Sequence, residues 1–392
     1  MIEAVIVDAV RTPMGRGKAG GALADVHAVE LLSGVLRSLV DRNRLDPVLV
    51  DDIIVGCVSQ AGEQSNTPGR MAALSAGFPV QTPATTIDRK CGSSQQAIHF
   101  AAQAVMSGQA EIVIAGGLES MSRIPMGTAR LGSDIFGPGV TSRFAPGLVS
   151  QGVAAELIAN RWAIERNELD AYSARSHERA AAAQAQGRFD AEVVAVETPL
   201  GPVAKDETIR PGTSASGLAE LRPAFQSDAM ESRFPELDWR LTAGSSSQLA
   251  DGAAALLVMS AAAAARLGLR ARARFVAFDV VGDDPLLMLT APIPATRRIL
   301  AKSGLTLDEI AHYEVNEAFA SVPLAWMREF DADPARLNPS GGAIALGHPL
   351  GASGARLMAT MLNALEQAGG RYGLQTMCEA GGMANATIIE RL

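Results

Sequence analysis

The last third of the chain repeats the pattern of the first third, and this repeat is the strongest limit on the fold. Residues 91–117 have the order turn, helix, strand and glycine pair, and residues 348–382 have the same order. The apolar run at 272–278 parallels the opening run at 2–7. Both units alternate helical patterns with short buried strands, which is typical of an α/β layered sheet. The sequence therefore predicts a duplicated α/β domain.

The segment between the two repeats differs from them in composition and pattern. Residues from about 118 to 250 carry turns rich in Gly, Pro and Ser and two long helical patterns, at 153–166 and 168–186. Strand patterns resume at 253–259, so we interpret the segment as an insertion into the sheet-bearing unit. The predicted domains are 1–118 plus 251–270 for the N-terminal half, 119–250 for an inserted loop domain, and 271–392 for the C-terminal half.

Local signals mark the ends of several elements. Thr67-Pro68 predicts a helix N-cap followed by proline at the first helical position, with Gly77 as the stop. Thr306 and Glu309 have the spacing of a capping box. Further strands are predicted at 52–58, 84–88, 111–115, 273–281, 312–316 and 374–378, and further helices at 26–40, 92–107, 317–330 and 351–368.

Composition and charge exclude several kinds of function. A net charge of −8 argues against a general affinity for nucleic acid, because no basic cluster is available to neutralise phosphates. The three cysteines include no CxxC pair, so neither a disulfide framework nor a metal site is predicted. No apolar run approaches membrane-spanning length, and no signal peptide pattern opens the chain. These features predict a cytoplasmic protein with reduced thiols and no membrane partner.

Cys91 stands where a predicted strand gives way to a helix that begins Gly92-Ser93-Ser94. A thiol at a helix N-terminus lies beside unpaired N–H groups and the positive end of the helix dipole. Both effects favour the thiolate and predict a lowered pKa, and the same N–H groups can stabilise an oxyanion. The other interpretation is a buried cysteine that packs as a small hydrophobe.

His348 lies at a loop-to-helix junction, between Gly347 and Pro349, in the glycine-rich segment 338–354. The segment matches neither a dinucleotide fingerprint nor a phosphate-binding loop. A histidine held there is well placed as a general base. The alternative is a structural turn with an incidental histidine.

Two further polar residues end predicted strands. Cys378 precedes the turn Glu379-Ala380-Gly381-Gly382, at the strand edge where α/β sheets place their ligands. Asn316 opens the run Asn316-Glu317-Ala318-Phe319 and can hold a water, bind a carbonyl oxygen or cap the following helix. For Cys378, simple packing is again the alternative, and Cys57, which lacks a glycine turn, is assigned to packing.

Together these segments resemble the thiolase family. The resemblance is carried by Cys91-Gly92-Ser93, by 316–320, by the long GGAIALGHPLG motif at 341–351, and by Cys378 before its glycine turn. It extends to the insertion, where 221–225, 242–247 and 251–255 are similar to the family's coenzyme A loop. It implies a five-layered αβαβα fold of two βαβαβαββ halves with a loop domain over the substrate, in a homodimer or homotetramer.

The resemblance also implies an activity and roles for the site residues. Thiolases cleave 3-ketoacyl-CoA with CoA, giving acetyl-CoA and a shortened acyl-CoA, or run the reverse condensation, with CoA as a substrate and no permanently bound cofactor. Cys91 then carries the acyl group, His348 takes its proton, and Cys378 moves the α-proton of acetyl-CoA. His348 with a water held by Asn316 forms one oxyanion hole, and the N–H groups of Cys91 and Ala380 form the other.

The family pattern places four residues near the substrate. Arg222 is expected near the adenine nucleotide of CoA, Ser247 near the pantetheine, and Met288 and Phe319 near the acyl group. For Arg222, a solvated surface charge is the plain alternative.

Three departures from the family pattern surround the nucleophile. Ala380 stands where thiolases usually have glycine, and alanine tolerates a positive φ poorly, which puts the oxyanion N–H geometry at issue. Ser94 replaces a usual glycine in a tightly packed turn. Lys90 precedes Cys91, where an apolar or amide residue is usual.

A fourth departure concerns the substrate. Ser150-Gln151 stand where biosynthetic acetoacetyl-CoA thiolases usually have His-Met, which favours a degradative enzyme. Residues 63–66 and 91–96 resemble actinobacterial thiolases, including those that act on steroid side chains. The alternatives are a biosynthetic acetoacetyl-CoA-forming thiolase and a thiolase-like protein that binds acyl-CoA with little turnover.

Overall fold

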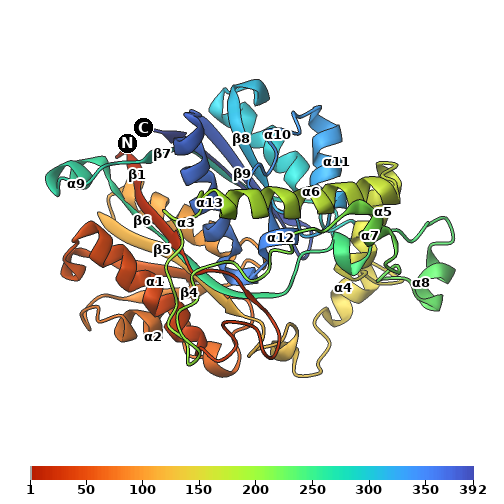
Figure 1. The fold of residues 1–392 in the computed structure, drawn as a ribbon, viewed down its shortest axis with the longest axis horizontal. Helices are drawn as coiled ribbons and strands as arrows, with labels where there is room; N and C mark the ends of the chain where they lie inside the picture. The colour runs from red at the N-terminus through yellow and green to blue at the C-terminus, as the bar shows by residue number, and fades with distance from the viewer. Residues whose placement is uncertain (1) are drawn as a thin grey trace.

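Two sets of strands with the same order lie side by side in the computed structural model, which describes residues 2–392 (Figure 1). The first set has the order β3, β5, β6, β1, and the second has the order β8, β9, β10, β7. In each set the first two strands are parallel and the later neighbours are antiparallel. The sets join where β1 meets β7 over two residue pairs, Val5–Arg274 and Ile6–Ala273. This shared topology confirms the duplication.

The strands have the following bounds. The first set is β1 (Ala4–Arg11), β3 (Asp52–Gly56), β5 (Ile112–Ser120) and β6 (Ala250–Ser260), with β4 (Ala84–Ile87) parallel to β3 at the edge and β2 (Gly15–Arg16) beside β6. The second is β7 (Ala273–Gly282), β8 (Ile310–Val315), β9 (Tyr372–Glu379) and β10 (Met383–Arg391). The counterpart of β4 is reduced to a bridge between Tyr313 and Leu337.

Helices complete five layers around the strands. The two central helices, α3 (Ser93–Ser107) and α13 (Ser353–Ala368), pack against each other between the two sets. The outer helices are α1 (Ala28–Asn43) and α2 (Pro68–Ser75) on the first set, and α10 (Pro292–Ser303) with α11 (Ser321–Phe330) on the second. Strands β1, β5, β6, β9 and β10 are buried on both faces because helices cover both, whereas β4 and β7 are partly exposed.

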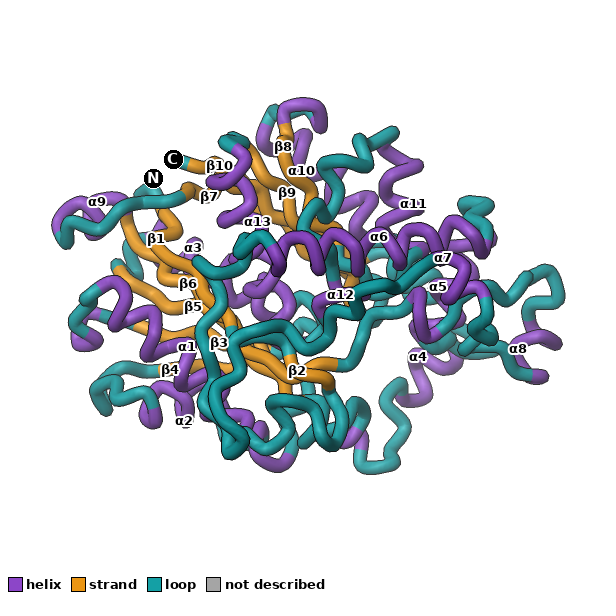
Figure 2. The backbone as a smooth tube through the Cα atoms, viewed as in Figure 1, coloured by secondary structure: helices purple, strands orange, loops and turns teal. Residues whose placement is uncertain are grey.

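The inserted segment forms helices that gather at one end of the molecule (Figure 2). They are α4 (Gly137–Arg143), α5 (Gln151–Arg161), α7 (Ala215–Ala219) and α8 (Asp228–Arg233), while α6 (Arg166–Ala185) runs back across the strands. The remaining helices are α9 (Ala261–Arg266) and α12 (Ala343–Leu346). Among residues 2–392, no helix combines the length and apolar character needed to cross a bilayer.

One local prediction was wrong, and a second is confirmed in position but not in its side-chain bond. Gly116 and Gly117 lie inside β5 and do not close it with a turn, whereas Gly381 and Gly382 form a turn with φ of 97° and 80°. The first pair is needed for close packing, since a Cβ on Gly117 would lie 2.0 Å from the carbonyl oxygen of Gly351. Thr67 occupies the N-cap position of α2, but its side chain makes no capping bond because its φ is 44°.

Candidate active site

The duplication places Cys91 and His348 at equivalent positions. Cys91 precedes Gly92, the N-cap of α3, and His348 precedes the short turn Leu350–Ala352 that leads into α13. The first turns of α3 and α13 touch, because a Cβ on Gly354 would lie 2.3 Å from the backbone nitrogen of Gln95. The fold therefore brings these two distant segments together.

An apolar cluster joins the segments that carry Cys91, His348 and Cys378. Cys91 packs with Leu350, two residues after His348, and with Met377, the residue before Cys378. The Cys378 thiol is fully buried, and the charge of a Cys91 thiolate would raise the pKa of Cys378. The two thiols are therefore neighbours in one enclosed space.

The pKa of Cys91 is raised, to about 12, and the predicted lowering is wrong. Burial is the main cause, and the nearby Glu379 carboxylate adds to it. The backbone N–H groups of Cys91 and Ala380 act in the opposite direction, as hydrogen-bond donors to the sulfur, and Lys90 adds a weaker effect of the same sign. Donors at the helix start are present as expected, but desolvation of the thiolate outweighs them.

Cys378 has an even less favourable environment for a thiolate. Its pKa is raised well above the ordinary value, first by burial, then by Cys91 and by Glu379. The amide of Asn316 stands close enough to lower that pKa slightly, although neither of its polar atoms has a well-formed hydrogen bond within residues 2–392. A buried amide without a partner is suited to hold a water or a substrate oxygen.

His348 is held as a neutral base. Its Nδ1 lies 2.5 Å from Ser353 Oγ, and that hydroxyl donates its single hydrogen to the carbonyl oxygen of Pro349 at 2.9 Å. Nδ1 must then be the donor to Ser353, which leaves Nε2 unprotonated. Nε2 is buried and has no hydrogen-bond partner in the described chain. Burial, together with the charge of Arg356, lowers the pKa of His348 to about 3, so the ring is neutral at physiological pH.

Two buried carboxylates, neither assigned a role from the sequence, hold the His348 segment. Glu119, at the end of β5, accepts hydrogen bonds from the N–H of Gly351 at 2.9 Å and from the N–H groups of Val58 and Ser59. It ties the His348 segment to the loop after β3. Its position among apolar residues at a strand end is the sequence signal that could have identified it.

Glu317 is the second of these carboxylates. Its oxygens accept from four donors: Tyr172 Oη at 2.9 Å, Ser176 Oγ at 2.7 Å, Asn338 Nδ2 at 3.1 Å and the N–H of Ile344 at 3.1 Å. These bonds join α6 of the insertion to the glycine-rich segment before His348. The position beside Asn316 was noted in the sequence, but only the asparagine was given a role.

The three departures around the nucleophile are accommodated. Ala380 is not among the residues with positive φ, because Gly381 and Gly382 take those conformations, and its N–H points at the Cys91 sulfur. Ser94 is fully buried, and its hydroxyl accepts from the N–H of Ala355. The Lys90 ammonium pairs with Asp88 at 2.6 Å.

The four residues expected to contact substrate fall into two groups. Met288 and Phe319 lie with Cys378 in one buried apolar cluster, and Met288 has a strained φ of 54°. Ser247 is beside them, since its N–H donates to the carbonyl oxygen of Ala318 at 3.0 Å. Arg222 differs from these residues in being exposed, on the loop after α7. Within residues 2–392, no group of three or more His, Cys, Asp or Glu side chains could hold a metal ion.

The comparisons with known proteins agree with this fold. The family models described as thiolase, N-terminal domain, and thiolase, C-terminal domain, match residues 4–262 and 269–391. A steroid 3-ketoacyl-CoA thiolase of Mycobacterium tuberculosis is 49% identical over 100% of this chain and 95% of its own. A 3-ketoacyl-CoA thiolase of Erwinia tasmaniensis is 45% identical, with 100% of both chains covered. The crystal structure of the Bacillus anthracis acetyl-CoA acetyltransferase has a TM-score of 0.88 at 36% identity, covering 100% of this chain and 99% of that one.

The chain therefore belongs to the thiolase family and has the thiolase fold. It is an acyltransferase.

Proposed function

We propose that the protein is a degradative thiolase, which cleaves 3-ketoacyl-CoA to acetyl-CoA and a shortened acyl-CoA through an acyl group carried on Cys91. The observation that carries the proposal is the enclosed pair of thiols, Cys91 and Cys378, beside a histidine whose Nε2 is free to accept a proton. The 3-ketoacyl-CoA thiolases related to this chain at 49% and 45% identity support the degradative direction.

The raised pKa of Cys91 determines when its proton is removed in the first step. A thiol with a pKa of about 12 and a histidine with a pKa of about 3 are both neutral at rest. We propose that His348 removes the Cys91 proton as the sulfur attacks the carbonyl carbon, so that no thiolate accumulates beforehand. The N–H groups of Cys91 and Ala380, which already face the sulfur, then stabilise the oxyanion that forms on the substrate.

Cys378 is proposed to handle the proton on carbon. During cleavage, the enolate of acetyl-CoA leaves the carbonyl carbon now bonded to Cys91, and Cys378 donates the proton that completes acetyl-CoA. CoA then attacks the Cys91 thioester and releases the shortened acyl-CoA. A thiol with a strongly raised pKa is a protonated donor at rest, which suits this role. Asn316 is proposed to hold a water beside His348, where its unpartnered amide supports such a role.

The inserted segment, taken as 119–250, is proposed to cover CoA. Ser247 would contact the pantetheine and Arg222 the adenine nucleotide, while Met288 and Phe319 would line the acyl site. Half-burial of Ser247 beside the apolar cluster supports its place, and exposure of Arg222 leaves its guanidinium free to meet phosphate. We further propose a cytoplasmic homodimer or homotetramer without a permanently bound cofactor.

The test follows the acyl group and the proton separately. Incubation with acetyl-CoA should add one acetyl group to the protein by intact mass, and Cys91→Ala should abolish the adduct. Cys378→Ala should keep the adduct but lose exchange of the acetyl α-protons with deuterated water. Cys57→Ala, which removes the third buried thiol, is the control and should keep both. An adduct that survives Cys91→Ala contradicts the proposal.

A comparison of thiolysis rates separates the remaining alternatives. Acetoacetyl-CoA, a long-chain 3-ketoacyl-CoA and a steroid CoA ester are the three substrates to compare. A preference for acetoacetyl-CoA would favour a biosynthetic thiolase, and tight CoA binding without thiolysis of any of them would indicate an acyl-CoA-binding protein.

A further inference from the structure

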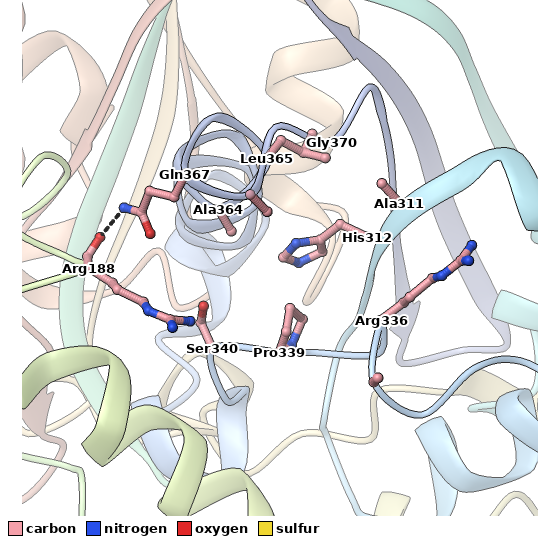
Figure 3. Close-up of a pocket in the computed structure, with 12 residues that line it drawn as sticks. Arg188, Ala311, His312, Arg336, Pro339, Ser340, Ala364, Leu365, Gln367 and Gly370 are labelled. Atoms are coloured by element: carbon pink, nitrogen blue, oxygen red, sulfur yellow. Dashed lines mark hydrogen bonds between the residues drawn. The ribbon is translucent and has the colours of Figure 1, made fainter. Parts of the chain in front are cut away.

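A cavity of about 360 Å³ opens at the end of α13 that is remote from His348 (Figure 3). It lies between the last turn of α13, the start of β8 and the loop that leads to α12. The 16 residues of α13 span about 24 Å at the ordinary helical rise, so the cavity is separate from the two thiols. Its wall is mostly apolar and includes Ala311, Pro339 and Leu365.

Three polar side chains from different segments converge on this cavity. Figure 3 shows the guanidinium of Arg188 beside Ser340 at one edge of the cavity, with the ring of His312 pointing into the cavity from the other side. The hydrogen bonds of Arg188 come from its backbone alone: its N–H donates to the carbonyl oxygen of Ala183 at 2.9 Å, and its carbonyl oxygen accepts from Gln367 Nε2 at 2.8 Å. The guanidinium therefore faces the cavity with its donors free of protein partners within residues 2–392.

His312 is the buried member of this group, with 4% of its surface exposed. Its Nε2 lies 2.7 Å from Oε1 of Glu314, which is itself 1% exposed. An ionised carboxylate can only accept, so the ring donates to Glu314 from Nε2. Nδ1 makes no hydrogen bond in the described part of the chain and is left for an occupant of the cavity.

Arg336 also lines the cavity but is already engaged. Its Nη1 donates to the carbonyl oxygens of Asp308 at 2.8 Å and Ile310 at 3.1 Å, and its Nε pairs with Asp333 at 3.4 Å. Figure 3 shows its side chain pointing away from the cavity. The cavity thus has one free guanidinium and one that is committed elsewhere.

We propose that this cavity is a binding site for a small organic anion, whose carboxylate or phosphate group is held by Arg188, His312 and Ser340 while its apolar body lies against the wall. A guanidinium fork and a hydroxyl match either kind of oxyanion, and burial of the ring removes water that would compete for it. The proposed thiolase mechanism uses none of these residues, and the anion site stands independently of it.

The test uses hexanoate and phenyl phosphate as separate probes. Each is titrated into the full-length protein in saturating CoA, which occupies the active site, and binding is followed by calorimetry and by the ring signals of ¹⁵N-labelled histidine. The chain has five histidines, so the His312 signal is assigned with His312→Gln. Saturable binding of at least one probe, with a shift confined to His312, is expected, and the probe that binds identifies the oxyanion.

Paired arginine variants decide whether the site is specific. Arg188→Gln should weaken binding by about tenfold or more, because hydrogen bonds to a charged group are lost. Arg336→Gln, on the same cavity, should change it by less than about twofold, since its donors face away. Arg188 is exposed, so its replacement leaves folding intact even where His312→Gln does not. Absence of saturable binding by both probes, or equal weakening by the two arginine variants, would overturn the proposal.

Discussion

The hydroxyl of Ser94 accepts a hydrogen bond from the backbone N–H of Ala355 at 2.9 Å. Ser94 lies in the first turn of α3, which follows Cys91, and Ala355 lies in the first turn of α13, which follows His348. The N–H groups of a first helical turn have no partner within their own helix. One side chain therefore satisfies such a group and links the helices that follow Cys91 and His348, the two residues proposed to react.

Ser94→Ala should destabilise the protein and slow turnover. The N–H of Ala355 would be left buried without an acceptor, which costs about 1–3 kcal/mol, and the two helix starts would lose a fixed separation. We expect a lower Tm and a kcat lowered by about tenfold with a smaller change in KM, because positioning of the reacting groups is lost. Thermal unfolding and steady-state thiolysis measure these effects.

Ser107→Ala is the matched control for this prediction. Ser107 ends the same helix, is exposed, and bonds only within its own turn, so the change should stay within about 0.5 kcal/mol. Equal effects of the two substitutions would show that the bond to Ala355 has no special role.

Glu379 makes the reactivity of Cys91 depend on pH. Its carboxyl group is buried against Gly92, without a well-formed hydrogen bond in residues 2–392, and burial raises its pKa to about 8. Because the folded pKa lies above the ordinary value of about 4.3, the stability that this group contributes is present below about pH 4 and is lost as the pH rises through 8. The ionised form also raises the pKa of Cys91.

Glu379→Gln should therefore stabilise the protein at pH 8–9, on the order of 2 kcal/mol, with little gain at pH 4–5. It should also move the alkylation of Cys91 by iodoacetamide to lower pH, because the thiolate no longer faces a carboxylate. Unfolding at several pH values and alkylation rates between pH 7 and pH 10 provide the measurements. An unchanged alkylation profile would show that the charge of Glu379 does not reach the sulfur.

The sequence predicted the elements that carry the site better than it predicted the environment of each residue. The helices after Cys91 and before Gly369 were found because periodicity and terminal glycines are local signals. The pKa of Cys91 was predicted in the wrong direction because the helix start is visible in the sequence, whereas burial is a property of the assembled fold.

The hydrogen bonds that Glu119 accepts illustrate the same limit of prediction from sequence. Its carboxylate binds the N–H of Gly351, 232 positions further along the chain, and no local pattern specifies such a pairing. The glycine pair at 116–117 was likewise taken to end its strand, because a glycine required for close packing has the same one-letter pattern as a glycine required for positive φ. The family motif led to the proposed reacting residues, but it gave no indication of the carboxylates Glu119 and Glu317 that hold the His348 segment.

Glu317→Ala should destabilise the protein strongly and loosen the insertion. Four buried donors would lose their acceptor at once, two of them on α6, and removal of such a group costs about 3–5 kcal/mol. We expect a large fall in Tm and faster limited proteolysis within 119–250. Glu178→Ala, on the exposed face of the same helix, is the control and should leave both unchanged.

Gly117→Ala tests the contact between β5 and the His348 segment. The new Cβ would lie 2.0 Å from the carbonyl oxygen of Gly351, a backbone atom that cannot rotate away. The segment after His348 must therefore shift, at a cost of about 3 kcal/mol, and His348 would move relative to Cys91, from which it is proposed to take a proton. We expect a fall in kcat of about 100-fold or more, since displacement by about 1 Å has such an effect on reacting groups.

Gly34→Ala is also a glycine-to-alanine substitution, but it is expected to stabilise the protein. Gly34 lies within α1, where an added Cβ meets nothing within 4 Å, so alanine should stabilise the helix by about 0.5–1 kcal/mol and leave kcat unchanged. Thermal unfolding and thiolysis of both variants, measured side by side, check the pair. If Gly117→Ala retained full activity, the His348 segment would have to tolerate displacement, and the close packing of β5 against Gly351 would not be what positions the base.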